Sequence, residues 1–302
     1  MWPRSFAHLI AAALLTFAAA PAAAQSLVLD SATGPYVEAI VNGVPLRLRV
    51  DFDLLSDISL NPEAAARAGL GNGEGRWVQR IGPVRLRGRT MRTDLTLAGV
   101  PARTMIRWHS RAVAEGADGL VSIDALPFDE VTVERRPAAA GERDISFATR
   151  VDDKHGLYLP VEVGNRRIAA RLSFFRLRTT APAAAAAVIA QRHGGAIETA
   201  PGGTEEVTLG VFRPVYLLEL QRPFAVGALA VPRIMVRTAD FRGGHRLVRR
   251  DGAEAGEAIV VTGERRSQES LYRITIGLDV LDRCSAATYR RLARTLTLRC
   301  AG

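Results

Sequence analysis

The chain is poor in lysine, cysteine and aromatic residues, and each shortage excludes a class of protein. Lys154 is the only lysine among 40 basic residues, and the rest are arginines spread in ones and twos. A composition with 6% aromatic residues and no basic run interleaved with aromatics argues against nucleic-acid binding. Two cysteines exclude a disulfide scaffold, and 48% hydrophobic residues exclude a disordered chain. The net charge of +9 indicates at most attraction to anionic surfaces.

Long apolar runs are absent after the first 24 residues. Arg4 precedes an apolar stretch from about Phe6 to Ala20, and small residues follow up to Ala24. This pattern is typical of a bacterial secretory signal peptide, and the run is shorter than the roughly 20 residues that span a bilayer. We therefore expect cleavage after Ala24 and a monomeric mature chain, without a membrane span, that is periplasmic or secreted.

The two cysteines, Cys284 and Cys300, are the only possible disulfide pair. Export would place them in an oxidising compartment, where an even number of cysteines usually indicates a bridge. A closed loop of about 15 residues would stabilise the fold by about 3 kcal/mol. The alternative is two buried free thiols.

Metal and cofactor motifs are absent from the sequence. Outside the first 24 residues, the histidines fall in different segments without metal-ligand spacing: His109, His155, His193 and His245. No Walker motif is present, and no glycine-rich dinucleotide motif precedes a helix pattern. We expect neither a metal nor a cofactor.

An internal repeat organises the remaining chain. Tyr36 and Asp51 recur 122 positions later as Tyr158 and Ser173. In each copy, an alternating strand meets a turn of asparagine and glycine and continues into a second strand that leads to the aspartate or serine. This is the strongest short-range signal for a β-hairpin.

Each hairpin is followed by an alanine-rich helix and a closing phrase. The first helix is predicted from Pro62 to Ala68, with Asn61 as the N-cap, and the second from near Pro182 to Arg192. The closing phrases are Leu120–Leu126 and Thr275–Leu281, which share an apolar pattern around an aspartate. The two halves of the chain therefore have one plan.

This spacing predicts two all-β lobes, at residues 25–150 and 156–302. The boundary falls in a charged, glycine-terminated linker at 152–156. The second lobe is longer because of a polar, glycine-rich insert at about 241–270. The segment Arg76–Leu97 is a candidate flap, since Gly82 and Pro83 suit the turn of a surface hairpin.

The repeated plan resembles the retropepsin-like aspartic proteases of bacteria. Members of that family have Asp-Thr-Gly or Asp-Ser-Gly in each lobe, whereas this chain reads Val50-Asp51-Phe52-Asp53 in the first lobe and Leu172-Ser173-Phe174-Phe175 in the second. The resemblance implies an all-β fold of two retropepsin- or pepsin-like β-barrel lobes, with short helices and a cleft between the lobes. It also implies that Asp51 and Ser173 occupy the two catalytic positions.

The chemistry of that family requires two carboxylates about 3 Å apart that share one proton. Ser173 cannot ionise near neutral pH, so the second catalytic position is degenerate. Phe52 and Phe174 lack the hydroxyl of the family motif, and Asp53 and Phe175 stand where the family has glycine. These losses together argue against ordinary activity.

Several acidic residues remain to be placed. Asp51 is either a surviving half of the catalytic pair or a relic carboxylate that accepts hydrogen bonds from loop amides. Asp53 is a candidate replacement partner, because alternate residues of an extended segment share a side. Asp57 is interpreted as a solvated turn residue, and Asp124 and Asp279 as structural acids after the closing phrases.

Three functions are compatible with these residues. The preferred one is a pseudo-protease that binds an extended peptide or a protein partner in the cleft, where Phe52, Phe174 and Phe175 would line the floor. Core filling is the alternative role for these rings. The second function is an active aspartic endopeptidase, a hydrolase that uses Asp51 with a nonstandard second acid. The third is a structural, envelope-associated protein.

Overall fold

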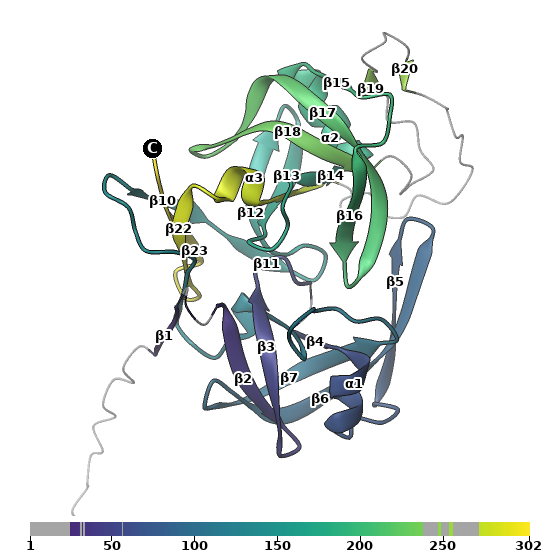
Figure 1. The fold of residues 1–302 in the computed structure, drawn as a ribbon, viewed down its shortest axis with the longest axis vertical. Helices are drawn as coiled ribbons and strands as arrows, with labels where there is room; N and C mark the ends of the chain where they lie inside the picture. Colours follow the sequence, from purple (N-terminus) through teal and green to yellow (C-terminus); the bar gives the residue numbers. More distant parts are fainter. Residues whose placement is uncertain are drawn as a thin grey trace, which may run out of the picture.

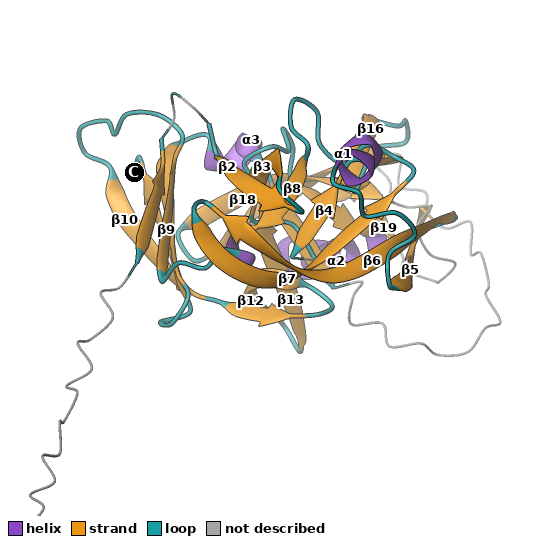
Figure 2. Ribbon diagram, turned by 90° about the horizontal axis from the view of Figure 1, so that it is seen from below, coloured by secondary structure: helices purple, strands orange, loops and turns teal. Residues whose placement is uncertain are grey.

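The fold is all-β, as predicted, with three large sheets and a few short helices (Figures 1 and 2). The computed structural model describes residues 25–30, 32, 34–55, 57–237, 247–248, 254–255 and 272–302. The predicted signal peptide, residues 1–24, and most of the predicted insert at 241–270 lie outside these residues.

The first sheet is built from the first half of the chain. Its seven strands have the order β2-β3-β8-β4-β7-β6-β5, and an additional pairing of β2 with β6 closes the first six into a barrel. The strands are β2 (Tyr36–Val41), β3 (Val44–Asp51), β4 (Ile58–Leu60), β5 (Gly75–Ile81), β6 (Val84–Leu97), β7 (Val100–His109) and β8 (Gly119–Ser122).

The second sheet repeats this plan with the second half of the chain. Its central order, β12-β13-β21-β14-β18-β17, corresponds strand by strand to β2-β3-β8-β4-β7-β6. The strands are β11 (Arg150–Asp152), β12 (Gly156–Val163), β13 (Arg166–Leu172), β14 (Thr180–Pro182), β15 (Ala196–Ile197), β16 (Gly203–Thr208), β17 (Val211–Val226), β18 (Leu229–Arg237) and β21 (Arg273–Ile276). The sequence repeat is therefore a repeat of topology.

The third sheet joins strands from both halves, in the order β1-β9-β22-β23-β10. These strands are β1 (Ser26–Leu29), β9 (Glu130–Glu134), β10 (Arg143–Ala148), β22 (Cys284–Arg290) and β23 (Thr295–Cys300). Cys284 and Cys300 face each other across β22 and β23 and form the predicted disulfide. A separate two-stranded sheet pairs β19 (Leu247–Val248) with β20 (Glu254–Ala255).

The predicted helices are present as α1 (Pro62–Arg67) and α2 (Ala183–His193), and the closing phrases form the 3₁₀ helix η1 (Ile123–Ala125) and α3 (Leu278–Leu281). Asn61 holds the N-cap position of α1, but its side chain does not cap the helix. Its amide instead accepts the N–H of Val113 and donates to the carbonyls of Ala114 and Ala117, and so holds that loop. Within the described ranges, no helix is long and apolar enough to cross a membrane.

The turns account for the hairpins and for the predicted linker. Asn42 and Gly43 both have positive φ, 50° and 78°, as the tight turn between β2 and β3 requires. The charged segment at 152–156 is the turn of the β11–β12 hairpin, where Asp152 accepts the backbone N–H groups of Lys154 and His155. The lobe boundaries stay a prediction, since the third sheet crosses them.

Apolar side chains form two buried clusters. The larger one extends through all three sheets. The smaller one, here called the gap cluster, lies between the β5–β6 hairpin and the turn that joins β16 to β17, and Figure 1 shows the β16–β17 hairpin reaching toward the first sheet. Its buried members are Leu54, Ile81, Leu86, Val113, Ala114, Leu120, Leu209 and Val211.

Candidate functional site

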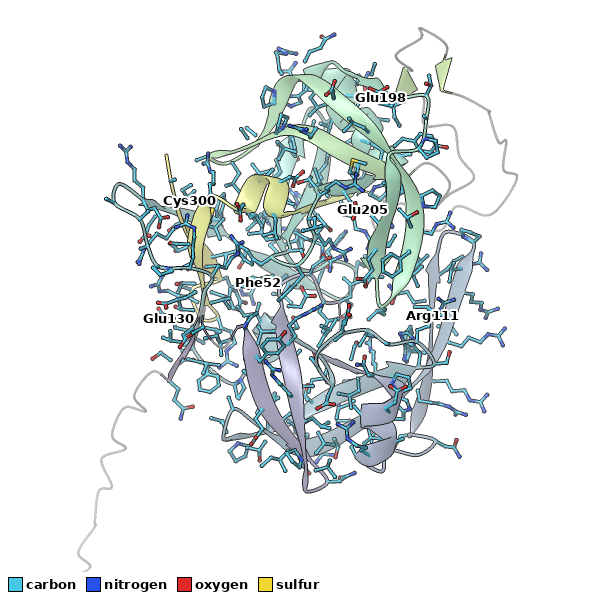
Figure 3. All side chains as sticks on the ribbon, in the orientation of Figure 1. Phe52, Arg111, Glu130, Glu198, Glu205 and Cys300 are labelled. Atoms are coloured by element: carbon cyan, nitrogen blue, oxygen red, sulfur yellow. A yellow bond between two sulfur atoms is a disulfide. The ribbon has the colours of Figure 1, made fainter. Side chains whose placement is uncertain are left out.

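Equivalent strand ends place the two degenerate motifs. Asp51 ends β3, which pairs in parallel with β8 so that Asp51 lies opposite Ser122. Ser173 follows β13, and its backbone N–H donates to the carbonyl of Ile276 on the parallel strand β21. The loops that follow these residues meet near the centre of the molecule, where Figure 3 places Phe52.

An aromatic pair joins the two loops. The rings of Phe52 and Phe174 pack edge to face, with centroids 5.3 Å apart and planes at 75°. Such a pair contributes roughly 0.5–1.5 kcal/mol beyond its burial. Phe52 and Phe174 are equivalent residues of the repeat, so this contact joins matching positions of the two halves. Both rings are buried and serve mainly as core.

Asp53 is held by two arginines from the second half of the chain. Its carboxylate Oδ1 lies 2.9 Å from Nε of Arg171, and its Oδ2 lies 2.8 Å from Nε of Arg176. The Oγ1 of Thr275 donates to Oδ1 at 3.3 Å. Only 2% of the Asp53 side chain and 4% of the Arg171 side chain are exposed. The ion pairs are therefore almost completely removed from solvent, and each Asp53 oxygen faces a cation.

The contacts between the loops follow the repeat. Arg171 lies 122 positions after Arg49, and Phe175 lies 122 positions after Asp53. Arg171 reaches Asp53 of the first loop, while the guanidinium of Arg49 stacks 4.0 Å above the ring of Phe175 in the second. The same strand position thus supplies an arginine in both halves, and each arginine crosses to the opposite loop.

Asp51 accepts a hydrogen bond from the turn that it begins. Its Oδ1 accepts the backbone N–H of Asp53 at 2.7 Å. Burial, and secondly the nearby negative charge of Asp53, raise the pKa of the Asp51 carboxyl. The candidate pair of Asp51 and Asp53 is thus joined through a backbone amide.

Ser173 has the matching structural role in the second loop. Its Oγ accepts the backbone N–H groups of Phe175 and Arg176, both at 3.4 Å, and the residue is 2% exposed. A serine hydroxyl can stabilise such a turn without a charge. The site therefore contains one buried carboxyl without a free acidic partner, a buried ionic cluster and a turn-forming serine.

The other acids have hydrogen-bond partners within the fold. Asp279 accepts the N–H and Oγ1 of Thr179 at 3.0 and 2.7 Å, and Asp124 accepts the hydroxyl of Ser122. Asp57 is not the solvated turn residue that we predicted, since it is half-buried and accepts the hydroxyl of Thr104 at 2.8 Å. Among the residues that the structure describes, no group of three or more metal-binding side chains is present.

The phenylalanines line a small pocket of about 170 Å³ between the two loops and β9. The pocket is lined by Gly34, Pro35, Val50, Phe52, Val133, Glu134, Arg135, Phe174 and Phe175. We predicted that these rings line the floor of a cleft between the lobes. Between the β5–β6 and β16–β17 hairpins, that space is filled by the gap cluster. The rings therefore face β9 and the Gly34–Pro35 turn.

Sequence reasoning missed Arg171 and Arg176. An arginine in an alternating strand is normally read as solvent-exposed, and Arg176 lies in an irregular loop. The only available signal was the repeat, because Arg171 has the same place in the second copy as Arg49 in the first.

Comparisons with known proteins include a distant similarity to a solved structure. No family model matches the sequence, and no curated protein matches it. Among solved structures, the retroviral protease-like domain of Ddi1 from Leishmania major is similar over 30% of this chain and 73% of that domain, with 20% sequence identity and a TM-score of 0.21. The all-β class of this chain follows from its own strands.

Proposed function

We propose that this chain is a pseudo-protease: an exported bacterial protein with a two-lobed, aspartic-protease-like fold that binds a partner and does not hydrolyse peptides. The observation that carries the proposal is the pairing of Asp53 with Arg171 and Arg176. That pairing removes Asp53, the candidate replacement for the missing carboxylate at Ser173.

The chemical reason is the requirement for two coupled carboxylates. One must act as a base on water while the other donates a proton to the peptide carbonyl. Asp53 has a guanidinium at each carboxylate oxygen, and Ser173 cannot ionise near neutral pH. Asp51 alone is left to perform two proton transfers, and it is buried with one oxygen bound to a backbone amide.

Packing between the hairpins also opposes hydrolysis. Leu209 and Val211 of the second half are buried in one apolar cluster with Ile81 and Leu86 of the β5–β6 hairpin. An extended peptide could enter there only by separating these side chains and exposing them to water, at a cost of about 1.5–3 kcal/mol for each fully exposed side chain. The partner is therefore expected to bind elsewhere between the halves.

The phenylalanine pocket is the place that we propose for the partner. Its volume of about 170 Å³ is similar to that of an engineered apolar cavity of roughly 150 Å³ that binds benzene. Phe52, Phe174 and Phe175 supply aromatic walls, and Arg135 and Glu134 supply charge at the lining. The pocket suits one apolar or aromatic side chain of a protein or peptide partner.

Selection from a peptide display library against the mature protein tests this proposal, with intact-mass analysis of each bound peptide. We expect intact peptides with an aromatic or large aliphatic anchor, and at least about tenfold weaker binding to Phe175→Ala. Phe212→Ala is the matched control, because Phe212 is 61% exposed on β17. Equal binding to both variants would exclude the pocket, and cleaved peptides would exclude the pseudo-protease.

A further inference from the structure

The β5–β6 hairpin carries an arginine ladder, defined as Arg76, Arg80, Arg85, Arg87 and Arg89. Residues of β5 alternate between exposed and half-buried up to the buried Ile81, with Arg76, Val78 and Arg80 on the exposed face. The strand register pairs Arg76 with Arg89, Val78 with Arg87 and Arg80 with Arg85. Because directly paired residues share a face of the sheet, the five guanidinium groups lie on one face.

These like charges destabilise the hairpin when no other molecule is bound to it. Like charges directly opposite each other on paired strands destabilise a sheet, and the hairpin has two such pairs. No ion pair joins any of the five arginines to another residue of the described part of the chain. Charges on an edge strand can prevent aggregation, but Arg89 lies where β6 is paired with both β5 and β7. An external anion would account for the whole set.

The face is concave and has an apolar centre. A groove of about 790 Å³ is lined by Arg76, Arg85, Arg87 and Arg89, together with Val78 and Trp108. Val78 is 53% exposed in the middle of β5, between Arg76 and Arg80. A groove with alternating cationic and apolar positions suits a chain-like ligand better than a flat anionic surface.

The outer edge of β5 gives that chain a backbone partner. β5 is the terminal strand of the first sheet and pairs only with β6 among the described strands. Alternate residues of a terminal strand direct their N–H and C=O groups away from the sheet. Extended peptides bind such edges by strand addition, with main-chain hydrogen bonds for affinity and side-chain contacts for specificity.

We propose that β5 binds an extended acidic peptide segment by strand addition. Acidic residues of the segment lie opposite Arg76 and Arg80, and an apolar residue between them lies opposite Val78. The required pattern is acidic-x-apolar-x-acidic, because side chains on one face of a strand recur at every second residue. The groove shares no lining residue with the phenylalanine pocket, and the site is independent of the pseudo-protease proposal, so failure of one leaves the other standing.

Fluorescence titration of the mature protein tests the site. After removal of residues 1–24, the remaining tryptophans are Trp77 and Trp108, which both line the groove. The peptide Ser-Glu-Ser-Val-Ser-Glu-Ser has the required pattern, and it is expected to change their emission and to bind roughly tenfold more weakly to Arg76→Ser/Arg80→Ser.

Arg143→Ser/Arg233→Ser is the matched control, because it removes the same charge from exposed positions on β10 and β18. It should bind the peptide as the unmodified protein does. Thermal unfolding of both variants checks that they are folded, and an equal loss of binding in both would overturn the proposal.

Strand addition is separated from simple charge attraction by N-methylated peptides. Two versions of the peptide carry N-methyl groups on the odd or on the even residues, with unchanged charge. Because only alternate amides face β5, one version should lose binding and the other should keep it. Equal binding of both versions, or stronger binding of a single-stranded oligonucleotide of equal charge, would overturn the proposal.

Discussion

The side chain of Asp53 makes the most buried ion pairs at the junction of the two loops. A carboxylate at this position without a counter-ion would be an uncompensated buried charge. Arg171 and Arg176 supply the compensation from the other half of the chain. These ion pairs connect the loop after Asp51 to the second half of the chain.

Asp53→Asn should destabilise the protein by about 3–5 kcal/mol, because it leaves Arg171 and Arg176 buried without their counter-ion. Urea unfolding at pH 7 measures this loss. The matched control is Asp144→Asn, which breaks the exposed pair with Arg299 and should cost less than about 1 kcal/mol. Similar losses in the two variants would show that the buried cluster is not the connection described here.

Asp51→Asn should change stability in a pH-dependent way. The pKa of Asp51 is higher in the folded state than in the unfolded chain, so its contribution to stability is fully present at low pH and is lost as the pH rises through the folded pKa. Asparagine cannot ionise, and its Oδ1 can still accept the N–H of Asp53. The variant should therefore gain stability relative to the unmodified protein between pH 3 and pH 7. A difference that stays constant or shrinks with pH would contradict the burial of Asp51.

At the scale of single residues, the sequence identifies the equivalent positions of the two halves. It does not predict which side chains they contact. The offset of 122 residues identifies Asp51 with Ser173 and Phe52 with Phe174. The partner of Asp53 could not be predicted, because buried ion pairs depend on which strands of the two halves meet. Nothing in the local pattern around Arg171 distinguishes it from a solvated arginine.

The sequence predicts the hairpins best among the elements of the fold. It predicts least how the hairpins pack against each other. Turn residues such as Asn42 and Gly43 fix the hairpins locally, and Gly82 and Pro83 correctly mark the turn between β5 and β6. Contact between the tips of two hairpins depends on tertiary structure, so the gap cluster was not anticipated. The sequence predicts a cleft between the lobes, and it leaves open whether Arg76–Leu97 is a flap.

Leu209→Ala should loosen the β5–β6 hairpin. Leu209 is 7% exposed in the turn between β16 and β17 and belongs to the gap cluster. Its truncation removes packing against the hairpin, so amide hydrogen exchange at residues 75–89 should become faster. Phe212→Ala, an exposed substitution on the same hairpin, should leave that exchange unchanged. If Leu209→Ala also left it unchanged, the hairpin would be held by other contacts.

The whole molecule is tied together by the third sheet. β1 and β9 come from the beginning and middle of the chain, and β22 and β23 from its end. These strands lie outside the repeated segments Tyr36–Leu126 and Tyr158–Leu281, so the repeat alone could not predict this sheet. It crosses the predicted boundary between the lobes, because β10 pairs with β23.

Replacing both Cys284 and Cys300 by serine should lower stability by about 3 kcal/mol, since the disulfide closes a loop with a sequence separation of 16. The β22–β23 ladder should persist, because its register is also held by five further residue pairs. Urea unfolding with and without reductant measures the effect. Reductant should have no influence on the variant, and an unmodified protein that is insensitive to reductant would contradict a stabilising bridge.

Peptide hydrolysis tests the absence of a catalytic pair most directly. The mature protein and Asp51→Asn are incubated with a mixed peptide library from pH 3 to pH 7, with and without a statine-type transition-state mimic. If Asp51 has no acidic partner, both proteins should show the same background rate of hydrolysis at every pH, and the mimic should not change that rate. Cleavage that is abolished both by Asp51→Asn and by the mimic would show that a working acid pair exists, and would contradict the role assigned here to Asp53 and its arginines.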